Sequence, residues 1–316
     1  MNGVPDGDDA DTLRAPLDAD VRALLDRWAE EPAMFAGTTP GTTDGVAAAR
    51  ARFAAQMIDA AGLPPRAPEL GEAGGVPVRV HRPSAPATDA VVVFVHGGGW
   101  VLGDGDAYDT VAARLADDLG AVVTAVDYRP APEHPFPGPL EDTLAAVRAL
   151  TADGARYALV GDSAGANLAA VTALTLRDEG RPPAASLLVY PPPDFEGRYP
   201  SVAENAEGHW LTAADVKACS KHYLAGHDPR GDVRLSPLRA PSLAGFPPTI
   251  VATAGYDPLR DAGHAFADAL VAAEVDARRR EHPALVHGFY AFTAAVPAAD
   301  AAVSALHAEL AELIAR

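Results

Sequence analysis

From Val76 onward the chain alternates between short, continuous apolar runs and amphipathic stretches of helical length. The apolar runs are rich in β-branched residues and are typical of strands that helices cover on both faces. This alternation predicts an α/β fold with a mostly parallel central sheet flanked by helices. We expect strands at 76–83, 89–96, 121–128, 157–161, 185–191 and 247–255, and helices at 109–120, 140–150, 164–178, 262–274 and 298–314.

Two further parts of the chain do not follow this alternation. Residues 17–31 and 46–61 each carry apolar side chains at helical spacing, with a turn-rich loop between them and a proline-rich link after them at 63–68. Nothing in this region resembles a chemical site. Residues 195–245 are polar, include a helix-like stretch at 212–226, and indicate an insertion over one edge of the sheet.

The composition narrows the classes of partner. The 316 residues include 43 Asp and Glu against 25 Lys and Arg, which gives a formal net charge of −18. Nucleic acids and anionic membranes require a basic footprint, and the chain has no run of basic residues. The single cysteine, Cys219, excludes an intrachain disulfide and a cysteine-rich zinc site. We expect neither a metal nor a cofactor.

The sequence also bears on localisation. No apolar run reaches the ~18 residues of a membrane-spanning helix. The acidic start of the chain has no apolar stretch of the kind that a signal peptide needs. We therefore expect a cytoplasmic protein that does not bind membranes.

The pentapeptide Gly161-Asp162-Ser163-Ala164-Gly165 lies between a predicted strand and a predicted helix. A G-x-S-x-G sequence in that setting is typical of a sharp turn that presents the serine hydroxyl at the N-terminus of the helix. Side chains at the two glycines would collide with the flanking strand and helix. We therefore predict Ser163 as a nucleophile. The alternative is a glycine-rich turn with an ordinary helix-capping serine.

Three successive glycines follow a predicted strand in the sequence HGGGW at 96–100. Uncovered backbone N–H groups can stabilise the negative charge that forms on an ester carbonyl oxygen, and losing one such donor typically costs ~3 kcal/mol. Gly98 is the first candidate donor, Gly97 or Gly99 the second, and Ala164 the third. The alternatives are a flexible turn or a phosphate-binding loop, although the spacing of a phosphate loop is missing.

A serine hydroxyl needs a base to become a nucleophile, and the base needs an acid to orient it. In hydrolases of this type the acid and then the histidine follow the serine along the chain. Asp257 comes just after the predicted strand at 247–255, and His287 lies in a later loop, so both satisfy this order. Three rivals lie nearby, of which we expect the two histidines to be structural: Asp261, His264 and His282.

Other residues have less specific patterns. Four aromatic side chains are candidates for the wall of a substrate pocket: Trp100, Tyr190, Trp210 and Phe289. For Trp210, packing in the core of the cap is an equally good explanation. Three polar residues among four prolines predict a satisfied, buried structural network: Arg129, Glu133 and His134. Cys219 lies on a predicted helix without a paired base, so we expect it to be inert.

These motifs together resemble a known family. The chain is similar to bacterial members of the hormone-sensitive-lipase family of α/β-hydrolase carboxylesterases. The resemblance runs from about Val76 to the C-terminus and rests on five motifs in order: HGGGW at 96–100, VDYRPAPEHPFPG at 126–138, GDSAG at 161–165, YDPLRD at 256–261 and HGF at 287–289. The departures affect substrate preference and not the triad: Pro130 replaces the usual Leu, Ala166 replaces a common Gly, and residues 190–194 are proline-rich.

The resemblance carries implications for organisation and roles. It implies a catalytic α/β-hydrolase domain at 71–316, with a helical cap formed by residues 1–70 and by a second segment inserted at about 195–235. It also implies a homodimer. The implied triad consists of a nucleophile, an acid and a base: Ser163, Asp257 and His287.

The leading hypothesis is a metal-independent serine carboxylesterase that forms an acyl-enzyme. Because a two-segment cap would enclose the pocket and no large apolar surface helix is present, we expect small water-soluble esters with short to medium acyl chains. An amidase or another acyl transferase on the same scaffold would use the same groups. A non-catalytic binding protein is a further alternative. The plant gibberellin receptors resemble these esterases but lack a working base, so the intact His287 argues against that alternative.

Overall fold

The computed structural model describes residues 13–39 and 41–316, so the expectations for residues 1–12 lie outside the described chain. Within it, one sheet has the strand order β1-β2-β4-β3-β5-β6-β7-β8. Its strands are β1 (Glu69–Ala73), β2 (Val76–His81), β3 (Val91–Val95), β4 (Val122–Val126), β5 (Tyr157–Asp162), β6 (Ala185–Val189), β7 (Thr249–Tyr256) and β8 (Ala277–Val286). β2 pairs antiparallel with β1 and β4, and every other pair is parallel. The predicted α/β fold with a mostly parallel sheet is confirmed.

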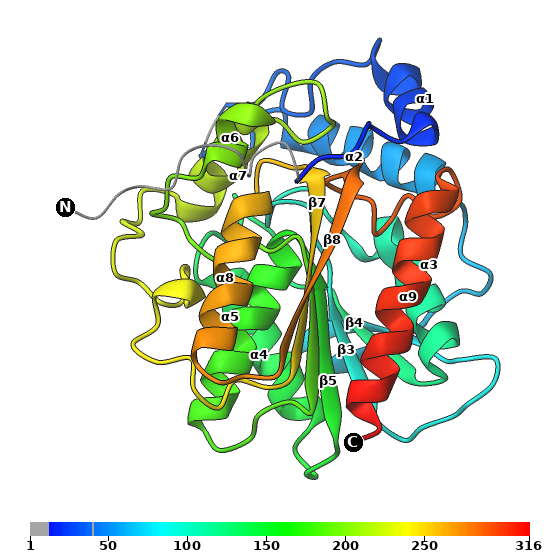
Figure 1. Ribbon diagram of the computed structural model, residues 1–316, viewed down its shortest axis with the longest axis vertical. Coiled ribbons are helices and arrows are strands. Elements are labelled where there is room, and N and C mark those ends of the chain that lie inside the picture. Colours follow the sequence, from blue (N-terminus) through cyan, green and yellow to red (C-terminus); the bar gives the residue numbers. More distant parts are fainter. Residues whose placement is uncertain (1–12, 40) are drawn as a thin grey trace.

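The helices are α1 (Ala19–Trp28), α2 (Val46–Ala61), α3 (Gly105–Leu119), α4 (Gly138–Leu150), α5 (Ala164–Asp178), α6 (Pro200–Glu204), α7 (Ala213–Leu224), α8 (Arg260–Ala272) and α9 (Pro297–Ile314), with a short 3-10 turn at Pro237–Arg239. Helices α3 and α9 cover one face of the sheet, and α4, α5 and α8 cover the other (Figure 1). Helices α1, α2, α6 and α7 lie beyond the end of the sheet at which the arrows of β7 and β8 point. No helix within residues 13–39 and 41–316 is long and apolar enough to cross a membrane.

Two strands at the edges of the sheet were not expected from the apolar pattern. β1 is exposed at four of its five positions, and β8 begins with the charged sequence ARRREH at exposed or half-buried positions. An edge strand has a neighbour on one side only, so it needs no apolar run, and its charges disfavour pairing with another sheet. The segment 195–245 also differs from expectation, because α6 and α7 lie beyond the ends of the strands and not along an edge (Figure 1).

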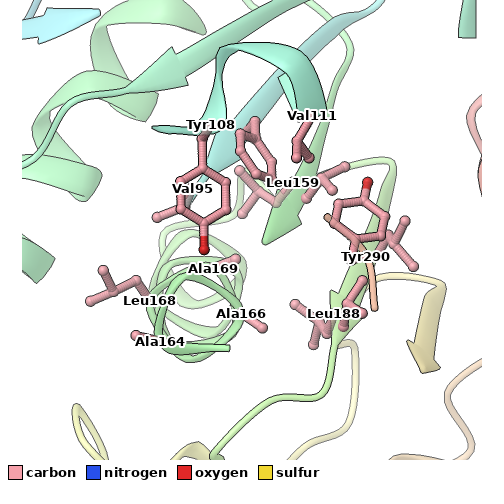
Figure 2. Packing of buried hydrophobic residues seen from close by; sticks show 14 of the residues in the cluster. Val95, Tyr108, Val111, Leu159, Ala164, Ala166, Leu168, Ala169, Leu188 and Tyr290 are labelled. Atoms are coloured by element: carbon pink, nitrogen blue, oxygen red, sulfur yellow. The ribbon is translucent and has the colours of Figure 1, made fainter. Parts of the chain in front are cut away.

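Helix α5 packs unusually close to the sheet. Figure 2 shows Ala166 and Ala169 of α5 among buried side chains of neighbouring strands, such as Leu159. At Gly165 a Cβ atom would lie 1.9 Å from the carbonyl oxygen of Val95 in β3. The N-terminal turn of α5 can therefore reach β3 only because residue 165 has no side chain.

Two of the three polar residues that were predicted to form a buried network, Arg129 and Glu133, form ion pairs at the surface. Arg50 of α2 makes two hydrogen bonds with the carboxylate of Glu133. Arg129 pairs with the buried Asp142, yet the Arg129 side chain is 52% exposed, and His134 is exposed. The predicted network is therefore structural but not buried. A surface position keeps these charged groups partly hydrated, which avoids the desolvation cost of a buried ion pair.

The close approach at Gly165 generates a test of the fold. We expect Gly165→Ala to lower the free energy of unfolding by about 1–3 kcal/mol, as overpacking usually does. Gly71→Ala is a matched control, since its added Cβ would lie at an ordinary 3.6 Å from Val78. Urea unfolding of both variants measures the difference. Equal free energies of unfolding in the two variants would contradict the steric argument.

Candidate active site

Ser163 lies at the sharp turn between β5 and α5. Its backbone has φ 52° and ψ −122°, a conformation that residues other than glycine rarely adopt. The Ser163 N–H donates to the carbonyl oxygen of Val189 at 2.9 Å, which fixes the turn against β6. This geometry leaves the serine half-buried at the wall of a cavity, although its neighbours in the chain are fully buried.

His287 and Asp257 complete a chain of hydrogen bonds that begins at Ser163. The Ser163 Oγ lies 3.0 Å from His287 Nε2, and His287 Nδ1 lies 2.8 Å from Asp257 Oδ2. Asp257 follows β7 directly and is fully buried, and its Oδ1 accepts the Leu259 N–H at 2.7 Å. With the proton on Nδ1, His287 presents an unprotonated Nε2 to the serine hydroxyl. The structure thus brings together three residues that are far apart in the sequence.

The HGGGW loop, after β3, supplies backbone N–H groups beside Ser163. The prediction of Gly97 as a donor to substrate is wrong, because its N–H donates to Asp162 Oδ1 at 2.8 Å. The N–H groups of Gly98, Gly99 and Ala164 have no hydrogen-bond partner in the part of the chain that the structure describes. Gly98 has φ +97°, and a Cβ there would lie 2.3 Å from a backbone nitrogen of the same loop.

Asp162 is a functional residue that the sequence analysis did not single out. Its buried carboxylate accepts hydrogen bonds from the Gly97 N–H and from the hydroxyl of Tyr108 at 3.1 Å. Burial raises the pKa of Asp162 to about 6, and these hydrogen bonds oppose a larger rise. In the sequence, the only indication was its position directly before Ser163. Its partners Gly97 and Tyr108 lie far from it in the sequence and come close only in the folded chain.

A cavity of about 230 Å³ opens in front of Ser163. Of the four predicted wall residues, Trp100, Tyr190 and Trp210 line it. Phe289 does not, because it is fully buried behind the ring of Tyr190 at a centroid distance of 5.4 Å. That prediction is wrong, because Phe289 packs in the core against the rings of Tyr190 and His282 and not against the cavity.

The N-terminal segment contributes to this cavity, although its sequence resembles no chemical site. Many of the cavity residues that the sequence analysis missed are apolar. They include Met34, Phe35, Phe53 and Met57 from the N-terminal segment, Val202, Leu211 and Val216 from the insertion, and Leu259 and Ala262 from the segment after β7. In the sequence, Phe53 and Met57 mark only the buried face of an amphipathic helix. Helical periodicity cannot distinguish a helix face that covers a cavity from one that packs in a core.

The remaining candidates lie elsewhere or are unreactive. Asp261 accepts the Ser201 N–H and pairs with Arg260, while His264 bonds to Thr253. Burial lowers the pKa of His282 to about 4. Cys219 also lines the cavity, and burial strongly raises the pKa of its thiol, which fits the expectation of an inert group. Across residues 13–39 and 41–316, no cluster of three or more His, Cys, Asp or Glu side chains could hold a metal ion.

Comparison with known proteins places this geometry in a family. A family profile described as alpha/beta hydrolase fold matches residues 92–291. The chain belongs to this family. Carboxylesterase NlhH of Mycobacterium tuberculosis is 38% identical to this α/β hydrolase over 90% of this chain and 92% of that protein. An ethyl acetate hydrolase of Pseudomonas putida is 35% identical over 71% of this chain and 74% of that protein.

Solved structures agree with these relatives. The ester hydrolase EH1AB1 from the metagenome of Lake Arreo superposes on this α/β hydrolase with a TM-score of 0.85. The two are 33% identical, and the match covers 95% of this chain and 100% of that chain. The predicted resemblance to hormone-sensitive-lipase-like carboxylesterases is confirmed.

The environment of Asp162 generates a prediction about pH. Because the folded-state pKa of Asp162 lies near 6, above the ordinary 3.8, its contribution favours folding below pH 3.8 and is lost as the pH rises through about 6. Asp162→Asn removes this dependence. We expect the free energy of unfolding of the variant, relative to the parent, to rise by roughly 2–3 kcal/mol between pH 4 and pH 7. Urea unfolding of both proteins across that range measures the difference, and a difference independent of pH would contradict the prediction.

Proposed function

We propose that this protein is a serine carboxylesterase that uses Ser163, His287 and Asp257 as its catalytic triad. The observation that carries the proposal is the continuous chain of hydrogen bonds from the Ser163 hydroxyl to the buried Asp257 carboxylate, at the wall of a mostly apolar cavity. The activity class agrees with the relatives, which are named carboxylesterases and esterases at 38–42% identity.

Catalysis begins with proton transfer from Ser163. His287 Nε2 takes the hydroxyl proton while Oγ attacks the carbonyl carbon of the ester, and a tetrahedral intermediate forms. The negative oxygen of this intermediate accepts hydrogen bonds from the N–H groups of Gly98, Gly99 and Ala164, which the protein leaves unused. The C–O bond to the alcohol then breaks, and His287 gives its proton to the leaving alcohol.

Hydrolysis of the acyl-enzyme repeats the same steps with water. His287 takes a proton from the water as its oxygen attacks the acyl carbon, and then returns the proton to Ser163 Oγ as the acid leaves. Asp257 keeps the histidine proton on Nδ1 and stabilises the imidazolium that forms in each half-reaction. Its second oxygen is held by the Leu259 N–H, so the carboxylate cannot rotate away from the histidine.

The helices beyond the strand ends act as a cap over this site. We assign the predicted segments 1–70 and about 195–235 to the cap, and residues 71–316 apart from that insertion to the catalytic domain. The assignment rests on the described residues, 13–39 and 41–70 in the first segment, because both segments supply walls of the cavity. The cavity that these walls enclose has a volume of about 230 Å³ and is lined mostly by apolar side chains. Such a site fits a small neutral ester with a short to medium acyl chain.

The triad assignment leads to a direct test. We expect Ser163→Ala and Asp257→Asn each to lower kcat for p-nitrophenyl butyrate by about 10⁴-fold or more, since each removes one element of the proton-transfer chain. Ser304→Ala, on the exposed side of α9, is the control and keeps the parent activity. Circular dichroism establishes that the variants are folded. Parent-like turnover in folded Ser163→Ala would overturn the mechanism, and faster turnover of a matched anilide than of the ester would instead indicate an amidase.

The cavity volume leads to a prediction about chain length. Across p-nitrophenyl esters, kcat/KM should be highest for acyl chains of about two to six carbons, because longer chains would extend beyond the cavity that the cap and the catalytic domain enclose. We expect a fall of at least about tenfold between the butyrate and the dodecanoate. Efficient hydrolysis of emulsified long-chain triglycerides would contradict this prediction.

A further inference from the structure

Trp210 occupies a junction between three parts of the chain. It belongs to the inserted segment, yet its ring stacks on Phe53 of α2 at 5.9 Å and meets the edge of Phe292, which follows the His287 loop, at 5.1 Å. Trp28 of α1 lies 6.2 Å away. The ring therefore joins the N-terminal segment, the insertion and the loop that carries the catalytic histidine.

The ring also packs directly against that loop. A Cβ atom on Gly288 would lie 2.4 Å from Cζ3 of Trp210, so the indole touches the residue that follows His287. The Trp210 and His287 rings lie side by side at 6.4 Å, with an angle of 27° between their planes. Any shift of the indole therefore changes the space available to the His287 loop.

The backbone of Trp210 does not hold this position unaided. Its φ of 69° lies in the left-handed region, which is unfavourable for a residue with a bulky side chain. Such conformations persist only where surrounding contacts impose them. The contacts of the side chain therefore decide whether the indole stays against the loop.

One polar contact orients the indole. Trp210 Nε1–H donates to Gln56 Oε1 at 2.8 Å, and Gln56 Nε2 in turn donates to Glu31 Oε2 at 2.7 Å. Gln56 itself is 7% exposed, and its amide links the half-buried Trp210 to the exposed Glu31. An indole N–H that loses its acceptor in this partly buried place loses a hydrogen bond that water replaces only in part, so the position of the ring depends on Gln56.

We propose that Gln56 is a positioning residue for catalysis, which acts through Trp210 to hold the His287 loop in its working geometry. This inference rests on the proposed function, because it takes His287 as the base. It gives α2 a role beyond covering the cavity. Gln56 does not line the cavity, so its substitution should act on turnover and not on substrate contacts.

The test compares two indole acceptors on the same helix. Gln56→Met removes the acceptor of Trp210, whereas Asp59→Leu removes the acceptor of Trp28, whose Nε1–H donates to Asp59 at 3.1 Å. Trp28 does not line the cavity. We expect Gln56→Met to lower kcat per titrated active site by about tenfold, with KM within twofold, and Asp59→Leu to change neither by more than twofold.

Rescue and coupling variants separate positioning from general damage. Gln56→Glu combined with Glu31→Gln rebuilds the same chain with the acceptor and donor exchanged, so kcat should return to within about twofold of the parent. Trp210→Phe should lower kcat to a similar extent as Gln56→Met. The double variant Gln56→Met with Trp210→Phe should be no slower than Trp210→Phe alone, because each change breaks the same hydrogen bond between residues 56 and 210.

A measurement without turnover keeps this test apart from the test of the proposed function. The chain has three tryptophans, so ¹⁵N-tryptophan labelling gives three indole signals, and Trp210→Phe assigns one of them. Gln56→Met should move that signal, while Asp59→Leu should move another. An unmoved Trp210 signal, an unchanged kcat, a failed rescue or additive losses would each overturn the inference. Full turnover in Ser163→Ala would instead overturn the proposed function and leave the indole result standing.

Discussion

One buried carboxylate joins the two loops on which the candidate site depends. Asp162 ends β5, directly before the strained Ser163, and it accepts the N–H of Gly97 at the start of the glycine loop after β3. Neither loop has a regular structure of its own there. The buried charge requires donors, and in supplying them Gly97 fixes the distance between the serine and the free N–H groups of Gly98 and Gly99. Burial of this acid thus aligns the nucleophile with the groups that would stabilise its intermediate.

The sheet brings the remaining parts together. Ser163, Asp257 and His287 follow β5, β7 and β8, whose parallel carboxyl ends meet at one side of the molecule. Residues more than 100 positions apart in the chain therefore reach hydrogen-bond distance without long loops. The inserted segment and α1 and α2 gather at that same side (Figure 1). Their apolar faces lower the water content around the polar groups, which strengthens each electrostatic interaction there.

The sequence predicts those features that depend on local pattern. Buried strands need apolar runs, so the central strands and the hydrolase motifs could be recognised, while the charged edge strand β8 could not. The HGGGW motif also indicated the glycine loop. It could not show which backbone N–H groups lack a partner within the protein, because the bond from Gly97 to Asp162 forms only in the folded chain. Phe289 was misplaced for a similar reason, since the direction of a side chain in a turn has no simple period.

The contacts of the N-terminal helices have a consequence for synthesis of the chain. The carbonyl oxygen of Ala60 accepts N–H groups from Ala294 and Ala295, and Trp28 packs edge-on against Phe292. Helices α1 and α2 therefore find these partners only after residues 62–291 have been synthesised. At about 5–20 residues per second, their apolar faces wait on the order of 10–50 s. During that interval the nascent chain exposes apolar side chains of α1 and α2, which a chaperone or the ribosome exit region could cover.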